Sequence, residues 1–369
     1  MSVRAPLRVA IIGAGGWAQK AHIPSFQKCE DARIVALCDA NKDLAGKVAN
    51  RFHIPHVYED YQELLEKEEI DAVDVCASAV SHFEIASEAI RRKKSVLCEK
   101  PLAQNLEQAR LLQSLAEKMG VKTKMGFTYR YSPALRYFKE LVDEGFVGQK
   151  YLFNGFEQNS QFIDPKTPFR WNPAEDSSKI MTGSLEEYAP HLIDIALWLM
   201  GGITSVTGRM RNFVPERLIR DLGKSLPINI EDATVWLADF EDGAMGTFQS
   251  SFIAIGGYPG MEVRLYGSKG AIIARLVEEF SVHETVSIAT PDRPEFRLRE
   301  IPDRFYPNGF SKQDHWIELY FGNLVRSFVR EVLENKIPEA GFADGARAQE
   351  VEDAVYLSHL NEQAVKLPL

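Results

Sequence analysis

Residues 13–18, Gly-Ala-Gly-Gly-Trp-Ala, have the types and spacing of a loop that binds phosphate groups. Gly13, Gly15 and Ala18 occupy the fixed positions of a G-x-G-x-x-G/A pattern directly after an apolar run. The first glycine permits a tight turn, the second lets the backbone approach a pyrophosphate, and Ala18 keeps the following helix close to the strand. The start of that helix offers N–H groups and a positive dipole end to phosphates. The pattern therefore predicts a dinucleotide site.

A carboxylate follows at the distance that such a site requires. Asp39 lies 21 residues beyond Ala18, at the end of a second apolar run. A carboxylate there accepts hydrogen bonds from the adenosine ribose and repels a 2′-phosphate, which favours NAD over NADP. Lys42 lies close enough to contact a phosphate and leaves NADP open. The alternative interpretation of Asp39 is a solvated acid at a strand end.

The elements that position these residues follow from the apolar pattern of the first 127 residues. Strand-like runs alternate with helical patterns, as a doubly wound parallel sheet requires. We expect strands at residues 7–12, 33–38, 72–77, 95–98 and 121–127. We expect helices from a capping box of Ser81 and Glu84 to about Arg92, and from Asn105 to Gly120. The sequence thus predicts an α/β Rossmann domain over residues 1–127.

The pattern changes after residue 127. Ser132-Pro133 begins a helix that ends at Gly145, and Asp242-Gly243 joins the alternating runs 232–241 and 244–253 as a hairpin. Gly267 to Gly270 forms a second turn. Further helices are expected at residues 184–200, 312–335 and 344–365. We predict an α+β C-terminal domain over residues 128–369 with a large, mainly antiparallel sheet.

Bulk composition excludes several classes of protein. The 369 residues exceed what one hydrophobic core usually serves, and the formal charge of −9 makes nucleic acid an unfavourable partner. No apolar run approaches the roughly 20 residues that span a bilayer, so we expect no membrane partner and a cytoplasmic protein. The four cysteines show no paired spacing, and His53 and His56 lack accompanying ligands, so we expect reduced thiols and no metal site.

Several motifs resemble the glucose–fructose oxidoreductase, inositol dehydrogenase and MocA family. The most specific is Glu99-Lys100-Pro101-Leu102-Ala103 after the run SVLC. Other matching segments are Ala21-His22-Ile23-Pro24, His82, GFTYRYSP at 126–133, and Gly267-Ser268-Lys269-Gly270. The resemblance covers essentially the whole chain and implies a homodimer or homotetramer.

The resemblance also implies roles for particular residues. Lys100 and His191 match the pair that faces the nicotinamide, and Glu187 takes the acidic position four residues before His191. Glu187 departs from the family's Asp, and Ala189 replaces its usual Gly. The expected cofactor-binding residues are Gly13, Gly15, Gly16, Trp17, Ala18, Asp39, Ser78, His82, Glu99 and Lys100. The expected substrate-binding residues are Lys100, Arg130, Tyr131, Arg170, Trp171, His191 and Asp194.

These residue types suit hydride transfer between a nicotinamide and a secondary alcohol or ketone. Histidine, with a reference pKa of about 6.5, suits a general base in oxidation and a general acid in reduction. A lysine at the end of a parallel strand stabilises developing alkoxide charge. On one helix, Glu187, His191 and Asp194 would share a face. We therefore expect an NAD(P)-dependent dehydrogenase or reductase acting on a sugar, sugar derivative or cyclitol. The alternatives are glycoside cleavage through transient oxidation, and a dinucleotide-sensing regulator without catalysis.

Overall fold

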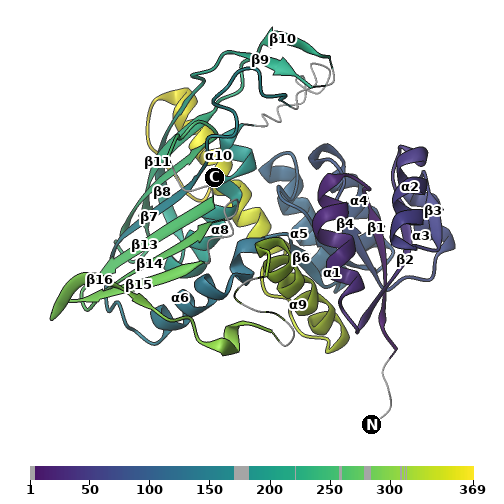
Figure 1. The fold of residues 1–369 in the computed structure, drawn as a ribbon, viewed down its shortest axis with the longest axis horizontal. Helices are drawn as coiled ribbons and strands as arrows, with labels where there is room; N and C mark the ends of the chain where they lie inside the picture. The colour runs from purple at the N-terminus through teal and green to yellow at the C-terminus, as the bar shows by residue number, and fades with distance from the viewer. Residues whose placement is uncertain are drawn as a thin grey trace. The chain divides into compact units, whose positions relative to one another are not determined.

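The computed structural model describes residues 5–169, 183–220, 222–256, 260–277, 284–307, 310, 312 and 314–369 (Figure 1). The chain divides into two compact units. The first contains Met1–Tyr131 and Asp314–Gln349, and the second contains Ser132–Gln313 and Glu350–Leu369. The division predicted at residue 127 places all of 314–349 in the second domain, whereas this segment packs with the first unit.

The first unit is built around a parallel sheet of six strands in the order β3-β2-β1-β4-β5-β6. Its strands are β1 Leu7–Ile12, β2 Ala32–Cys38, β3 His56–Tyr58, β4 Ala72–Val75, β5 Ser95–Cys98 and β6 Thr123–Met125. Its helices are α1 Ile23–Gln27, α2 Lys42–Phe52, α3 Tyr61–Lys67, α4 Ala79–Arg91, α5 Leu106–Met119 and α9 Gly322–Leu333. The prediction of a doubly wound Rossmann sheet is confirmed.

The strand register brings four chain segments to one edge of this sheet. Ile12 pairs with Cys38 of β2 and with Val75 of β4, and Val75 pairs in turn with Cys98 of β5. All of these strands are parallel, so the residues after each strand emerge at the same carboxyl edge. β1 lies between β2 and β4, where the strand order reverses, and this is the place where open α/β sheets bind ligands.

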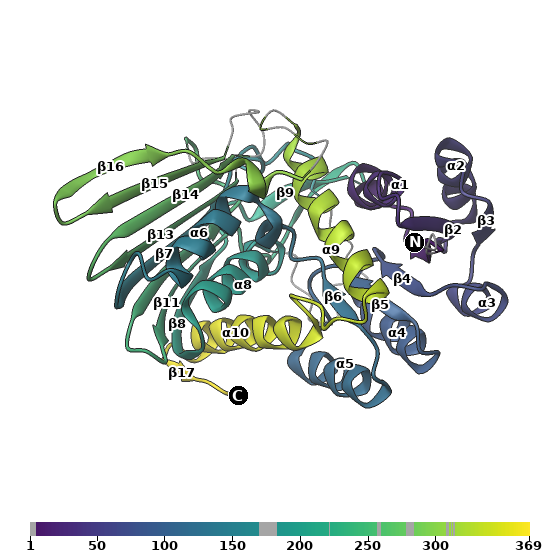
Figure 2. The same cartoon turned by 90° about the horizontal axis from the view of Figure 1, so that it is seen from below.

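The segment around α9 completes the core on one face of the six-stranded sheet. Apolar side chains from β1, β2 and α1 form one cluster with Phe321, Leu324, Val325, Phe328 and Val329. α9 contacts α1 directly, and Figure 2 shows the two helices on one side of the strands. Burying a large apolar side chain contributes about 1.5–3 kcal/mol. The cluster therefore explains why a segment distant in sequence belongs to the first unit.

The second unit is built around a sheet of nine strands in the order β16-β15-β14-β13-β7-β12-β11-β8-β17. Neighbouring strands are antiparallel except for the parallel pair β7 and β12, so the prediction of a mainly antiparallel sheet is confirmed. The strands are β7 Lys150–Gln158, β8 Ile203–Arg211, β11 Ala233–Phe240, β12 Met245–Ser251, β13 Gly260–Gly267, β14 Ala271–Val277, β15 Thr285–Thr290, β16 Arg293–Arg299 and β17 Val365–Lys366. β9 Glu216–Ile219 and β10 Lys224–Pro227 pair separately.

Helices cover one face of the nine-stranded sheet. α6 Pro133–Asp143 contacts β14 and β15, and α8 Ala189–Met200 contacts β7 and β12 (Figure 2). α7 is the short helix Ser184–Glu187, and α10 is Phe342–Asn361. Residues of β11 alternate between buried and exposed, as expected for a sheet with one covered face.

Three predicted helix boundaries are wrong for identifiable reasons. α4 begins after Ser78 rather than at the Ser81–Glu84 capping box, and Ser81 donates its backbone N–H to Ser78 O within the first turn. α10 ends at Asn361, and Val365 lies in β17 instead. The predicted helix 184–200 breaks at Tyr188, because Pro190 lacks the N–H that would continue the first turn.

Candidate active site

The glycine loop after β1 has a backbone that only glycine can adopt at its first position. Gly13 has φ +111°, and a Cβ there would lie 2.3 Å from the carbonyl oxygen of Cys76. Its N–H donates to Cys38 O at 2.8 Å, which ties the loop to the end of β2. Gly13 thus allows the close approach of three strand ends.

The next two glycines border open space. A Cβ at Gly15 or Gly16 would meet no protein atom within 4 Å. Gln19 donates its N–H to Gly15 O at 3.1 Å, so the helical turn starts at the loop itself, and Ala18 is completely buried beneath it. A site with this room beside a helix start fits the pyrophosphate of a dinucleotide.

Asp39 fastens the end of β2 to the same loop. Its Oδ2 accepts the N–H of Ala14 at 2.8 Å, and its Oδ1 accepts the N–H of Asn41 at 2.8 Å. Each carboxylate oxygen has two lone-pair directions and can accept a second donor. Asp39 is half-buried, so its oxygens retain the capacity to accept ribose hydroxyls while holding the loop.

The Glu99-Lys100 turn follows β5 at the adjacent strand end. Glu99 accepts the backbone N–H of Lys100 through Oε2 and the indole N–H of Trp17 through Oε1, both at 3.2 Å. A Cβ at Gly126 would lie 2.6 Å from Oε1, so this glycine leaves room for the carboxylate. Two hydrogen bonds therefore fix the backbone that carries the half-buried Lys100.

His82 joins the loops that follow β4 and β5. It is 1% exposed, with Nδ1 2.7 Å from Pro101 O and Nε2 3.1 Å from Ala77 O. Burial lowers the pKa of this imidazole. His82 is thus enclosed beside the Lys100 turn, whereas Ser78 is exposed at the carboxyl end of β4.

In the second unit, His191, the predicted general base, and its predicted neighbours Glu187 and Asp194 differ in how far they are exposed. Glu187 is exposed at the end of α7, His191 is half-buried in the first turn of α8, and Asp194 is 1% exposed. The prediction that one continuous helix presents all three is wrong, because the helix breaks at Tyr188. The Tyr188 hydroxyl accepts a hydrogen bond from Asn159 Nδ2 at 2.5 Å, which fixes the break.

The chain that leads to His191 is anchored by a buried carboxyl at the start of β11. Glu231 Oε1 accepts the N–H of Leu185 at 2.6 Å and the hydroxyl of Ser184 at 3.3 Å. A Cβ at Gly183 would lie 1.3 Å from Oε2, so Gly183 packs directly on this carboxyl. Burial raises the pKa of Glu231 to about 7.

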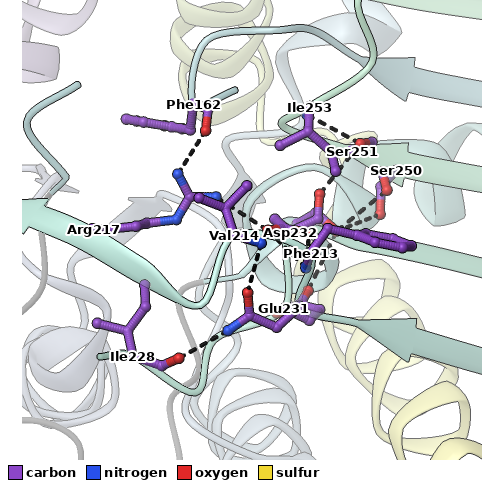
Figure 3. Close-up of polar contacts among 12 residues, drawn as sticks. Phe162, Phe213, Val214, Arg217, Ile228, Glu231, Asp232, Ser250, Ser251 and Ile253 are labelled. Carbon is purple, nitrogen blue, oxygen red and sulfur yellow. Dashed lines mark hydrogen bonds and ion pairs between the residues drawn. The ribbon is translucent and has the colours of Figure 1, made fainter. Parts of the chain in front are cut away.

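The neighbouring Asp232 anchors a different segment (Figure 3). It accepts the backbone N–H groups of Phe213 and Val214 and an N–H of Arg217 at 3.1 Å. Arg217 is 1% exposed and also donates to Phe162 O. Consecutive acids at the start of β11 therefore hold the β9–β10 hairpin and the His191 segment.

Arg130 and Tyr131, predicted to bind substrate, are buried in the first unit. Arg130 Nη2 lies 3.2 Å from Asp344 Oδ1, and the Tyr131 ring lies 5.1 Å from Lys124 Nζ. The contact between Arg130 and Asp344 joins the end of the first segment to the start of α10, whereas Lys124 lies in β6. Arg170 and Trp171, also predicted to bind substrate, lie outside the described residues.

Comparison with known families assigns both halves of the chain. Residues 7–127 match the family model described as "Oxidoreductase family, NAD-binding Rossmann fold", and residues 135–273 match the GFO/IDH/MocA C-terminal domain. The chain belongs to the GFO/IDH/MocA oxidoreductase family. The resemblance predicted from Glu99-Lys100-Pro101 is confirmed.

Relatives of this GFO/IDH/MocA chain include named dehydrogenases. Levoglucosan dehydrogenase of Pseudarthrobacter phenanthrenivorans is 25% identical, and myo-inositol 2-dehydrogenase of Thermotoga maritima is 26% identical, each over 98% of both chains. A solved structure of levoglucosan dehydrogenase in complex with NADH is 25% identical, with a TM-score of 0.84 over 98% of this chain and 99% of that chain. Among the described residues, none of the helices is both long and apolar enough to cross a membrane.

Two residues beside the candidate site were not predicted from the sequence as site residues. Trp316 lies 6.0 Å from the ring of Trp17 and 6.1 Å from that of Tyr129, beside the glycine loop. Its only signal was a tryptophan at the start of an expected helix. His22 lies completely buried behind Glu99. Its segment carried the family resemblance, but nothing local indicated its two acidic neighbours.

Proposed function

We propose that the protein is an NAD-dependent dehydrogenase or reductase acting on a secondary hydroxyl or keto group of a sugar, sugar derivative or cyclitol. One observation carries the proposal: Lys100 and the glycine loop lie at the same edge of one parallel sheet, joined through Glu99 and Trp17. The names of the relatives support the substrate class, because they act on levoglucosan and myo-inositol.

Lys100 supplies the positive charge in the proposed reaction. A bound nicotinamide dinucleotide accepts the hydride in oxidation and donates it in reduction. The Lys100 ammonium hydrogen-bonds the reacting oxygen and stabilises the negative charge that grows on it as the C–H bond breaks. Because Glu99 holds the backbone of Lys100, the ammonium needs little reorganisation before the reaction.

His191 moves the proton in this proposal. During oxidation its imidazole accepts the hydroxyl proton, and during reduction the imidazolium returns a proton to the alkoxide oxygen. The start of α8 is held by Glu231 through Ser184 and Leu185, and by the Tyr188–Asn159 hydrogen bond. Glu187, exposed at the end of α7, is proposed to assist His191.

We assign NAD rather than NADP to the dinucleotide site. The carboxylate of Asp39 stands at the end of β2 and would repel a 2′-phosphate. Gly13, Gly15, Gly16 and Ala18 would hold the pyrophosphate, with Trp17 and Ser78 beside it. We assign His82 and Glu99 to holding the cofactor-side loops, since their side chains bond to those loops.

Asp194, Arg130, Tyr131, Arg170 and Trp171 stay predicted substrate-binding residues, together with Lys100 and His191. Recognition of a hydroxyl-rich substrate needs several hydrogen-bonding groups besides the two that meet the reacting oxygen. The cytoplasmic location also stays a prediction. All four cysteines are free, which agrees with a reducing compartment.

We propose that a second copy of the chain covers the exposed face of the nine-stranded sheet, giving a homodimer or homotetramer. Leu152, Val235, Leu237 and Met245 are each 43–57% exposed on neighbouring strands of this face. Several exposed apolar side chains on neighbouring strands are typical of a protein interface.

The test is a screen for NADH formation. NAD and NADP are each offered with a panel of sugars and cyclitols, and NADH absorbance is followed. We expect turnover with NAD and at least one polyol, together with an oxidised product that keeps its glycosidic bonds. Cleavage without net NADH formation would support the glycosidase alternative and contradict the proposal. Dinucleotide binding without turnover on any substrate would favour a regulator.

A further inference from the structure

A completely buried histidine lies between two carboxylates behind the Lys100 turn. Nδ1 of His22 is 2.7 Å from Oδ2 of Asp74, and Nε2 is 3.3 Å from Oε1 of Glu99. His22 and Asp74 are 0% exposed and Glu99 is 8% exposed. The first contact is a hydrogen bond, and the second is an ion pair without hydrogen-bond alignment.

The donors around Glu99 indicate that this carboxyl is ionised. Oε1 accepts the indole N–H of Trp17, and Oε2 accepts the backbone N–H of Lys100. Both are N–H donors, so each oxygen is used as an acceptor and neither contact requires a proton on Glu99. A carboxylate with so little solvent needs a compensating positive charge nearby. Nε2 of His22 is 3.3 Å from it.

Two further groups lie against His22. Phe321 covers the imidazole, with ring centroids 4.3 Å apart. Cys76 also faces it, and burial raises the pKa of the Cys76 thiol, which keeps the thiol neutral. Burial opposes a charge on His22, but Asp74, which also hydrogen-bonds Nδ1, is the strongest of the neighbours that raise the pKa of the imidazole well above its ordinary value.

We infer that His22 is a positioning residue, held as an imidazolium between Asp74 and Glu99, whose charge fixes the Glu99 carboxylate and through it the backbone of Lys100. The inference rests on the proposed role of Lys100 in hydride transfer. His22 touches neither substrate nor cofactor in this account. Without it, two buried carboxylates would face each other, and Glu99 would have to take up a proton or move away from the Lys100 N–H.

The charge on His22 is tested by ¹⁵N NMR of the full-length protein labelled at histidine. The chain has 8 histidines, and the His22 signals are assigned by their loss in the variant His22→Gln. We expect both ring nitrogens of His22 to be protonated at pH 8, where an ordinary histidine with a pKa of about 6.5 is neutral. Nitrogen chemical shifts of a neutral imidazole at pH 8 would overturn the inference. The NMR measurement does not depend on the catalytic activity of any variant.

The positioning role is tested by steady-state kinetics with the substrate found in the screen. His22→Gln combined with Asp74→Asn removes the charges of both residues together and leaves Glu99 without the neighbouring imidazolium. We expect kcat to fall by about a hundredfold while the Kd for NAD changes less than about threefold, because misplacement of the reacting group is felt mainly in the chemical step. Unchanged kcat would overturn the role.

Further variants distinguish a positioning role of His22 from a general loss of stability and from failure of the proposed function. Phe26→Leu, at a completely buried side chain of α1, should lower the melting temperature while kcat stays near wild type. The single variant His22→Arg, with Asp74 unchanged, places a positive charge at the same position, and we expect its kcat to be higher than that of the neutral double variant. If Lys100→Ala turned over normally, the proposed function would fail although the NMR result for His22 could stand.

Discussion

Oε1 of Glu231 accepts the backbone N–H of Leu185 at 2.6 Å, and this bond holds the segment that leads into the His191 helix. The carboxyl accepts hydrogen bonds from Leu185, Ser184 and Thr234, yet burial still raises its pKa to about 7. A group with this property links the stability of the second unit to pH.

We predict that the protein loses stability as the pH rises from about 4.5 to about 7. In this window the unfolded chain has released the Glu231 proton, whose ordinary pKa is 4.5, while the folded chain keeps it. Folding therefore becomes less favourable by on the order of 3 kcal/mol across the window and changes little beyond it.

Urea denaturation at several pH values measures this slope. Glu231→Gln should flatten it, because an amide does not ionise, whereas Glu241→Gln, at an exposed acid just after β11, should leave it unchanged. A slope that survives in Glu231→Gln would assign the pH dependence to other groups.

Substitutions at two glycines of the loop after β1 should have different effects on stability and on NAD binding. Gly13→Ala should destabilise the protein by about 3 kcal/mol or more, because it combines a positive φ with a backbone clash at Cys76. Gly15→Ala should leave stability within about 0.5 kcal/mol, because its methyl group meets no protein atom. It should weaken NAD binding at least about tenfold, because the methyl group enters the space proposed for the pyrophosphate.

Thermal denaturation and calorimetric titration with NAD provide these two quantities. Gly46→Ala in α2 is the matched control, because its Cβ also meets no atom within 4 Å. It should stabilise the helix by up to about 1 kcal/mol and leave NAD affinity unchanged. Normal NAD affinity in Gly15→Ala would contradict the proposal that this loop binds the pyrophosphate.

Asp39 should set the choice of dinucleotide. Asp39→Ser removes the charge that repels a 2′-phosphate, so the ratio of kcat/KM for NADP to that for NAD should rise by about tenfold or more. Comparing both cofactors with one substrate gives the ratio. Asp43→Asn, which removes an exposed charge four residues later, should not change it. An unchanged ratio in Asp39→Ser would remove Asp39 from cofactor selection.

The exposed sheet face should carry the oligomer interface. Leu237→Glu places a charge on strand β11 at a side chain that is 57% exposed, so the folded chain should tolerate it. We expect native mass spectrometry to show smaller species for Leu237→Glu than for the wild-type protein. An unaffected assembly, or a wild-type monomer, would contradict the proposed interface.

The sequence predicted the placement of those candidate site residues whose signals are local. The glycine loop, Asp39 and the Glu99-Lys100 turn each follow an apolar strand run, and the parallel sheet then places them at one edge. His22 could not be predicted in the same way, because its partners Asp74 and Glu99 come from two later strands.

The packing of a late segment and the break in a helix also escaped prediction. Periodicity indicates that 322–333 is helical, but it does not say which core the apolar face joins. Likewise, the spacing of Glu187 and His191 suits one helix, whereas Pro190 between them removes the hydrogen bond that such a helix needs.

The most direct test of the account is turnover by Lys100→Ala with NAD and the substrate identified by the screen. Because the ammonium stabilises charge only as the C–H bond breaks, kcat should fall by about a hundredfold or more while the Kd for NAD stays within about threefold of wild type. A variant that oxidises the substrate at the wild-type rate would contradict the assignment of Lys100, and with it the proposed mechanism.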